Sequence, residues 1–211
     1  MPNWCNTEVV FIGENVEKLY NDWQKANKKF KKEGDQGWLG RLFMYRNVTM
    51  PIQSNEKAEI LGRLFKEPYC RSFINDIHMT QKDTLLMSTL DAWKPVIDAY
   101  NKIADMYNLN FVVKAEEPGQ EIYLNTDATG KYFPERYIFE FFCNSYIPYN
   151  LLVNKLNSLD AQRYFSSFTQ VSEILSGYGV KTEEDMEYFC EYIRNKYPDC
   201  IINFHEYEEE L

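Results

Sequence analysis

Three carboxylates lie close together in the middle of the chain, where acid–base chemistry is conceivable. Glu116, Glu117 and Glu121 flank a turn at Pro118 and Gly119. Paired carboxylates can exchange protons with a substrate when burial separates their pKa values. The two β-rich runs around this turn predict a hairpin, and the tip of a hairpin is usually exposed to water. We therefore expect no catalysis at this turn.

The cysteines and histidines show no spacing that is typical of a metal site. The two histidines, His78 and His205, are far apart, and no two cysteines are spaced as Cys-x-x-Cys. This pattern predicts no zinc site, no iron–sulfur cluster and no disulfide framework, and it favours five buried, reduced thiols. The cysteines are Cys5, Cys70, Cys143, Cys190 and Cys200.

No motif of an enzyme or of a bound cofactor occurs. The repeat of Gly34, Gly37 and Gly40 lacks the Gly-Lys-Ser/Thr of a phosphate-binding loop, so it predicts a flexible loop around Trp38. The motifs of α/β-hydrolases, zinc proteases and calcium-binding loops are also missing. We expect a non-catalytic protein without a cofactor.

The negative charge is concentrated near the C-terminal end. The net charge is −9, and residues 182–211 hold ten acidic and two basic side chains. The run Glu208, Glu209 and Glu210 closes this acidic end. Such a surface repels the phosphate backbone of nucleic acids. It either keeps the protein in solution or attracts a basic protein partner.

One group of basic residues favours the opposite partner, a single-stranded nucleic acid. A lysine run ends the first predicted helix, and an aromatic side chain and an arginine follow it in the next loop. Lysines at the C-terminal end of a helix also have a structural explanation, because the helix dipole favours cations there. The residues are Lys25, Lys28, Lys29, Lys31, Lys32, Trp38 and Arg41.

The hydrophobic pattern predicts an α+β protein with two parts. Residues 1–130 alternate strands and helices in the order of a ferredoxin-like antiparallel sheet with helices on one face, with a helical insertion near 54–80. Residues 131–211 form a C-terminal α+β extension with the acidic end. The predicted strands are 8–13, 42–50, 84–90, 109–115, 121–125, 137–143 and 200–204. The predicted helices are 14–32, 55–66, 91–107, 148–156, 169–176 and 182–197, with Asp91 and Thr182 as caps.

The sequence contains no apolar run of the roughly 20 residues that a membrane helix needs. The first residues lack the basic and apolar regions of a secretory signal. We therefore expect a cytoplasmic protein.

Three short segments resemble the YubB ferredoxin-like family, whose members are encoded largely by phages, plasmids and gut bacteria. The opening Met1-Pro2-Asn3-Trp4-Cys5 is similar to the start of that family. Thr89–Pro95, which includes Trp93, is similar to its strand-to-helix segment, and Glu116–Gly119 is similar to its Glu-and-Gly turn. Residues 67–83 have no counterpart of the family's tryptophan-rich patch. The resemblance implies a ferredoxin-like fold and an origin in mobile elements, but no activity.

Together these features favour a non-catalytic binding or adaptor protein with a protein partner, and the alternative is a single-stranded nucleic-acid-binding domain. We expect no membrane and no metal, and nucleic acid is the less favoured partner because of the net charge. The candidate binding residues are Trp38, Trp93, Glu116, Glu117, Gly119, Glu208, Glu209 and Glu210.

Overall fold

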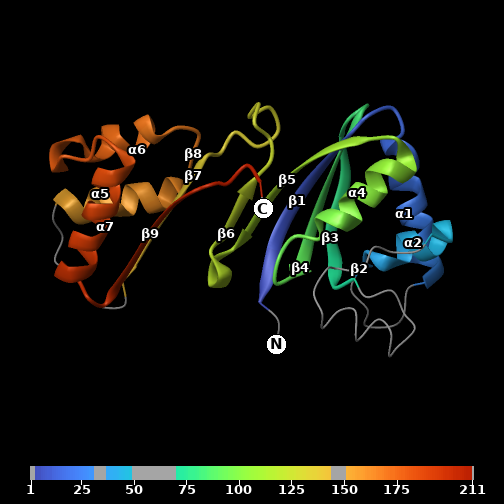
Figure 1. The fold of residues 1–211 in the computed structure, drawn as a ribbon, viewed down its shortest axis with the longest axis horizontal. Helices are drawn as coiled ribbons and strands as arrows, with labels where there is room; N and C mark the ends of the chain where they lie inside the picture. Colours follow the sequence, from blue (N-terminus) through green and yellow to red (C-terminus); the bar gives the residue numbers. More distant parts are fainter. Residues whose placement is uncertain (1–2, 31–36, 49–69, 144–150, 211) are drawn as a thin grey trace. The chain divides into compact units, whose positions relative to one another are not determined.

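A computed structural model describes residues 3–30, 37–48, 70–143 and 151–210. The chain divides into two compact units, Met1–Thr126 and Asp127–Leu211, which we call unit 1 and unit 2 (Figure 1). The division falls close to the boundary expected at residue 130. Both units combine helices with antiparallel strands, so the α+β class is confirmed.

Unit 1 is built on a six-stranded antiparallel sheet with the strand order β2-β3-β4-β1-β5-β6. The helices α1, α2 and α4 lie on one face of this sheet (Figure 1). We call the other face, on which no described helix packs, the open face. The elements in chain order are β1 (Trp4–Ile12), α1 (Val16–Phe30), β2 (Gly37–Trp38), α2 (Gly40–Arg46), β3 (Ser72–Gln81), β4 (Thr84–Ala92), α4 (Ile97–Tyr107), β5 (Asn110–Glu117), the 3-10 turn η1 (Pro118–Gln120) and β6 (Ile122–Asn125).

The two faces of this sheet follow from the alternation of side chains along its strands. In β1 the side chains of Cys5, Val9 and Phe11 are fully buried under the helices, whereas Trp4 and Asn6 point to the open face and are exposed. Helix α1 adds an apolar stripe at helical spacing to the same core. Its buried apolar residues are Val16, Leu19, Trp23 and Ala26.

Two predictions in unit 1 were wrong. The expected strand at 42–50 begins as helix α2, because Leu39, Leu42 and Phe43 bury one helical face. The helix ends at Asn47, which adopts a left-handed conformation with φ 53°. The helical insertion expected near 54–80 contains strand β3 over its last part, and residues 54–69 lie outside the described residues.

Unit 2 has a three-stranded antiparallel sheet with the order β8-β7-β9. Its helices lie on one face of that sheet (Figure 1). Thr182 caps α7 as predicted, and the Asp185 carboxylate completes a capping box by accepting the backbone N–H of Thr182 at 2.9 Å. The elements are β7 (Tyr137–Cys143), α5 (Leu151–Gln162), β8 (Tyr164–Phe165), α6 (Phe168–Leu175), the 3-10 turn η2 (Ser176–Tyr178), α7 (Glu183–Lys196) and β9 (Cys200–Glu206).

The expectation of five reduced thiols was wrong, because Cys143 and Cys200 form a disulfide. These two residues lie directly opposite each other on β7 and β9, with a Cα–Cα distance of 4.0 Å. They are 57 residues apart in sequence, so only the strand pairing brings them together. Cys5, Cys70 and Cys190 are free and buried.

Among the described residues, no helix is both long enough and apolar enough to cross a membrane.

Candidate functional site

Trp38 is a structural anchor of unit 1. Its indole Nε1–H donates to the carbonyl oxygen of Cys70, and its ring packs against the core. The ring fills the space where a Cβ at position 40 would stand, so Gly40 must remain without a side chain. The prediction of a flexible loop around Trp38 is therefore wrong for the described residues from 37 onward, which form β2 and the start of α2.

The turn after β5 is more buried than a hairpin tip usually is. The side chain of Glu117 points to the helix side of the sheet and is only 4% exposed, and its Oε1 accepts the backbone N–H of Gly119 at 3.1 Å. A Cβ on Gly119 would lie 2.6 Å from the Asn3 amide nitrogen, so any larger residue here would require the Asn3 side chain to move. Glu116 lies on the open face, 3.9 Å from the ammonium group of Lys114. The prediction that this hairpin turn is exposed to solvent is therefore wrong for Glu117.

The basic residues proposed for nucleic-acid binding do not form one exposed site. Lys25, Lys28 and Lys29 are exposed on α1, which packs on the helix side of the sheet. Arg41 is only 2% exposed, and its guanidinium donates to the side-chain oxygen of Asn27. Burial removes Arg41 from any surface that a phosphate backbone could reach. Lys31 and Lys32 lie outside the described residues.

The acidic end gathers several carboxylates on unit 2. The Tyr137 hydroxyl donates to Glu183 at 2.7 Å. Burial, followed by the charge of Glu183, raises the pKa of Glu206 above that of an ordinary glutamate. Glu208, Glu209 and Glu210, which close the acidic end, are exposed to solvent.

No group of three or more histidine, cysteine or acidic side chains in the described part of the chain is arranged to hold a metal ion.

The open face of unit 1 carries a cluster that we call the sheet-face patch, made of Trp4, Arg71, Phe73 and Trp93. The rings of Trp4 and Phe73 meet edge to face, with centroids 5.7 Å apart, although they belong to β1 and β3 with β4 between them. The guanidinium of Arg71 lies over the Trp93 ring, 5.6 Å from its centroid. Trp4 and Trp93 are each 38% exposed. One side chain from each of β1 and β3, one from the residue before β3 and one from the turn after β4 thus form this exposed, largely aromatic surface.

The backbone at Trp93 is strained in a way that fixes its ring. Trp93 has a positive φ of 67°, a conformation that costs a bulky residue free energy. Its backbone N–H donates to the carbonyl oxygen of Asn3 at 2.8 Å. Strain that persists on a half-exposed tryptophan is a feature that often marks a binding site.

Buried polar groups support the sheet beneath this patch. Asp91 on β4 lies between Cys5 on β1 and Ser72 on β3, and all three side chains are fully buried on the helix side. The Asp91 Oδ2 accepts the Tyr100 hydroxyl at 2.6 Å and the backbone N–H of Val96 at 3.2 Å. The helix expected from Asp91 begins later, at Ile97, and Asp91 itself belongs to β4.

The environment of Asp91 changes its protonation. Burial raises its pKa above that of an ordinary aspartate, although several hydrogen bonds act in the opposite direction. The groups that favour the ionised form are the side chains of Ser72, Tyr100 and Thr7 and the backbone N–H of Val96. The same burial raises the pKa of the Cys5 thiol to about 12, so this cysteine is not a ready nucleophile.

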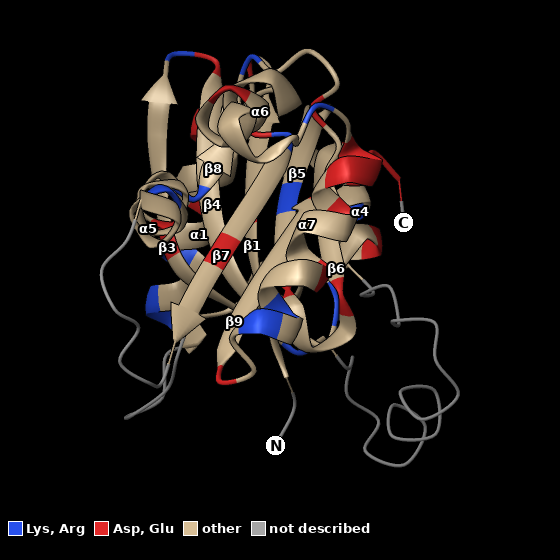
Figure 2. Ribbon diagram, turned by 90° about the vertical axis from the view of Figure 1, so that its left-hand side faces the viewer, with Lys and Arg blue, Asp and Glu red and all other residues tan. Residues whose placement is uncertain are grey.

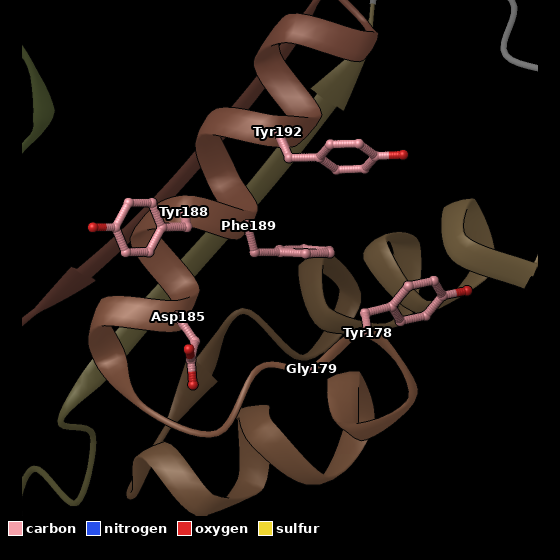
Figure 3. A pocket seen from close by; sticks show the side chains of 6 residues that line it. All are labelled: Tyr178, Gly179, Asp185, Tyr188, Phe189 and Tyr192. Atoms are coloured by element: carbon pink, nitrogen blue, oxygen red, sulfur yellow. The ribbon is translucent and has the colours of Figure 1, made fainter.

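Unit 2 has a hollow of about 430 Å³ between α7 and the turn η2, which we call the tyrosine hollow (Figure 3). The Phe189 ring lies at its base, 6.2 Å from the Tyr178 ring, and is largely buried. In Figure 3 the rings of Tyr178 and Tyr192 extend to the same side, whereas Tyr188 projects from the other side of α7. The lining residues are Tyr178, Gly179, Asp185, Tyr188, Phe189 and Tyr192.

Of the sequence-predicted binding residues, only Trp93 belongs to one of these two surfaces. Sequence reasoning missed Trp4, Arg71 and Phe73 because the strand β3 was not recognised. Alternating polar and apolar residues from Ser72 onward were the available signal for that strand. The sequence predicted both the helix that carries Tyr188 and Tyr192 and the end of the preceding helix at Gly177 and Gly179, but not that the two would lie next to each other.

Comparison with known proteins identifies no relative: no family model matches the chain, and neither a curated protein nor a solved structure shows a significant similarity to it.

Proposed function

We propose that this chain is a non-catalytic binding or adaptor protein that recognises a protein partner through the sheet-face patch of unit 1. The observation that carries the proposal is the exposed cluster of Trp4, Phe73 and Trp93, with Arg71 stacked on one of its rings. Aromatic and arginine side chains are enriched at the centres of protein interfaces.

The chemistry of the patch favours an extended, proline-containing segment as its ligand. Neither the Trp4 nor the Trp93 indole N–H donates to an acceptor within the described residues. A polyproline II segment has no internal hydrogen bonds, so its carbonyl groups can accept from such donors while its rings pack on aromatic faces. Residues 1–126 hold 16 basic and 17 acidic side chains, so unit 1 offers no strong field for a charged ligand.

A single-stranded nucleic acid is the second candidate, because aromatic side chains on a sheet can stack with unpaired bases. The geometry supports it less well. The exposed lysines Lys25, Lys28 and Lys29 are on α1, behind the sheet, whereas the patch is on the open face. Arg71 is the basic residue that lies within the patch itself, and its guanidinium is already stacked on Trp93.

Titration of the intrinsic tryptophan fluorescence separates the two candidates. A decaproline peptide should change the emission of Trp4 and Trp93, whereas a Gly-Ser peptide of equal length and a poly-dT oligonucleotide at low salt should not. Trp93→Leu and Phe73→Leu should each weaken peptide binding about tenfold.

Phe142→Leu is the matched control, since Phe142 is also an exposed aromatic residue but lies in unit 2. It should leave peptide binding unchanged. Tight poly-dT binding that is lost in Trp93→Leu would mean that the patch binds single-stranded nucleic acid. The absence of any response to either ligand would refute both.

We further propose that unit 1 is a ferredoxin-like domain of the YubB kind. The support is the strand order β3-β4-β1-β5 with α1 and α4 as the connecting helices, which corresponds to a β-α-β-β-α-β arrangement. The mobile-element origin depends on the sequence resemblance alone. The cytoplasmic location stays a prediction, and the Cys143–Cys200 disulfide is the observation against it, because disulfides are rare in reducing compartments.

A further inference from the structure

Two of the aromatic rings that line the tyrosine hollow, Tyr178 and Tyr192, each lie next to a lysine side chain of the same chain. The Lys155 ammonium lies over the Tyr178 ring, 5.8 Å from its centroid, and donates to the carbonyl oxygen of Ile174. The Lys196 ammonium lies 5.1 Å from the centroid of Tyr192. A cation over the face of an aromatic ring is attracted by the electron-rich π system. Both walls of the hollow therefore have the chemistry that binds ammonium and guanidinium groups.

A fixed negative charge lies at one end of this hollow. The backbone N–H of Lys181, followed by the side chain and backbone N–H of Thr182, lowers the pKa of Asp185 below that of an ordinary aspartate. Asp185 therefore stays ionised at neutral and mildly acidic pH. Its capping hydrogen bonds to the backbone of Lys181 and Thr182 hold the carboxylate in place, and the charge of Lys181 makes a smaller contribution.

The surroundings of the hollow add to this negative charge. Residues 127–211 hold 15 acidic and 7 basic side chains. Glu183 and Glu184 join Asp185 in the acidic first turn of α7, where they offset the positive end of the helix dipole (Figure 2). Unit 2 therefore attracts a basic partner, whereas unit 1 is nearly neutral.

We propose that the tyrosine hollow is a second binding site, which receives a lysine or arginine side chain of a basic protein partner. The aliphatic stem of that side chain packs on Phe189 between Tyr178 and Tyr192, and its charged head lies toward Asp185. This site does not depend on the sheet-face patch. A protein with both sites joins two different partners, which is what an adaptor does.

Fluorescence anisotropy of a labelled peptide with alternating glycine and lysine, added to the full chain, tests the site directly. The peptide should bind, and the same peptide with glutamine in place of lysine should not. Raising the salt from about 0.05 M to about 0.5 M should weaken binding strongly, because surface charges are screened within a few ångströms at high salt. An arginine version of the peptide should bind at least as tightly as the lysine version.

Variants that keep the fold locate the binding site. Tyr178→Leu and Tyr192→Leu should each weaken binding about two- to fivefold, and Tyr192→Phe should restore it because the ring is retained. Asp185→Asn removes the charge while its side-chain oxygen can still accept the capping N–H groups, and it should also weaken binding. Circular dichroism and thermal melting of each variant establish that it is folded.

The matched control removes charge from unit 2 outside the hollow. A triple Glu208→Gln, Glu209→Gln, Glu210→Gln variant loses three charges, whereas Asp185→Asn loses one. If the hollow is the site, Asp185→Asn weakens peptide binding more than the triple variant does. A larger effect of the triple variant, with no effect of the tyrosine variants, means diffuse attraction to the acidic end and overturns the proposal. Failure of the wild-type chain to bind either basic peptide also overturns it.

Discussion

Trp93 donates its backbone N–H to the carbonyl oxygen of Asn3 at 2.8 Å, and this bond joins the residue after β4 to the residue before β1. It lies at the end of the sheet where the start of β1, the turn after β4 and the turn after β5 meet. Gly119, in the turn after β5, lies next to the Asn3 side chain. The bond also stabilises the positive φ of Trp93, so it contributes to the orientation of the exposed ring.

The strain at Trp93 predicts an unusual order of stability among its variants. A positive φ costs an alanine more conformational free energy than it costs a glycine. The free energy of unfolding of Trp93→Gly should therefore exceed that of Trp93→Ala by about 1 kcal/mol. Urea denaturation of the two variants measures this difference. Both variants should lose peptide binding at the patch. A glycine variant that is less stable than the alanine variant would mean that the left-handed conformation is absent.

The buried carboxyl of Asp91 predicts a pH-dependent stability. The folded protein holds the Asp91 proton to a higher pH than the unfolded chain does, because burial raises the pKa in the folded state. The stability that this proton contributes is therefore complete below the ordinary aspartate pKa and is lost as the pH rises through the raised value. Relative to Asp91→Asn, the wild type should lose stability as the pH rises above the ordinary aspartate pKa of about 4.

A second variant at this position separates protonation from hydrogen bonding. Asp91→Ala leaves the Tyr100 hydroxyl and the Val96 N–H without this acceptor, which should cost on the order of 1–3 kcal/mol at all pH values. Asp91→Asn keeps an acceptor and can place its amide near the Ser72 hydroxyl on the paired strand. Chemical denaturation of both variants across this pH range is the measurement. Parallel curves for the wild type and Asp91→Asn would show that Asp91 does not titrate as we expect.

The number of free thiols tests the disulfide directly. Titration under denaturing, non-reducing conditions should detect three thiols, and five after reduction, because Cys143 and Cys200 are bonded. The native protein should react slowly, since burial raises the pKa of Cys190 to about 11 and that of Cys5 to about 12. Five thiols without reductant would contradict the disulfide and remove the observation against a cytoplasmic location.

Two aromatic residues of α1 should differ sharply in their contribution to stability. Trp23 is 3% exposed within the core of unit 1, so Trp23→Ala should lower the free energy of unfolding by about 3–5 kcal/mol. Phe30 at the end of α1 is only partly buried. Phe30→Ala should therefore cost less than half as much. Equal costs would show that Phe30 also packs in the core.

Much of the strand and helix pattern of unit 1 could be predicted, because periodicity was strong there. The regions 84–90, 109–115 and 121–125 all correspond to strands. Buried residues alternate with less buried ones along β4, whereas the β-rich runs on both sides of the Pro118-Gly119 turn were the signal for β5 and β6. The stretch from Leu42 was misread as a strand, because Leu, Phe, Met and Tyr suit both structures. This stretch is a helix because Leu42 and Phe43 pack in the core of unit 1, and the sequence alone does not show that packing.

The binding surfaces were much harder to predict than the elements. Trp4 and Phe73 become neighbours only because β4 lies between β1 and β3, and strand order cannot be read from spacing. The cross-strand pair of Cys143 and Cys200 escaped prediction for the same reason. Trp93 could be singled out, but its conformation depends on a hydrogen bond to a residue near the other end of unit 1.

The central position of β1 has a consequence for how the chain folds during synthesis. Trp4 pairs with Ala92, and Asn6 pairs with Glu116, so the first strand made receives its neighbours late. Contacts between residues so distant in sequence form slowly, because a long loop must close first. The nascent β1, with Val9, Val10 and Phe11 exposed, must therefore remain unpaired until β4 and β5 have left the ribosome. During that interval the strand is a natural target for chaperones and for aggregation with other nascent chains.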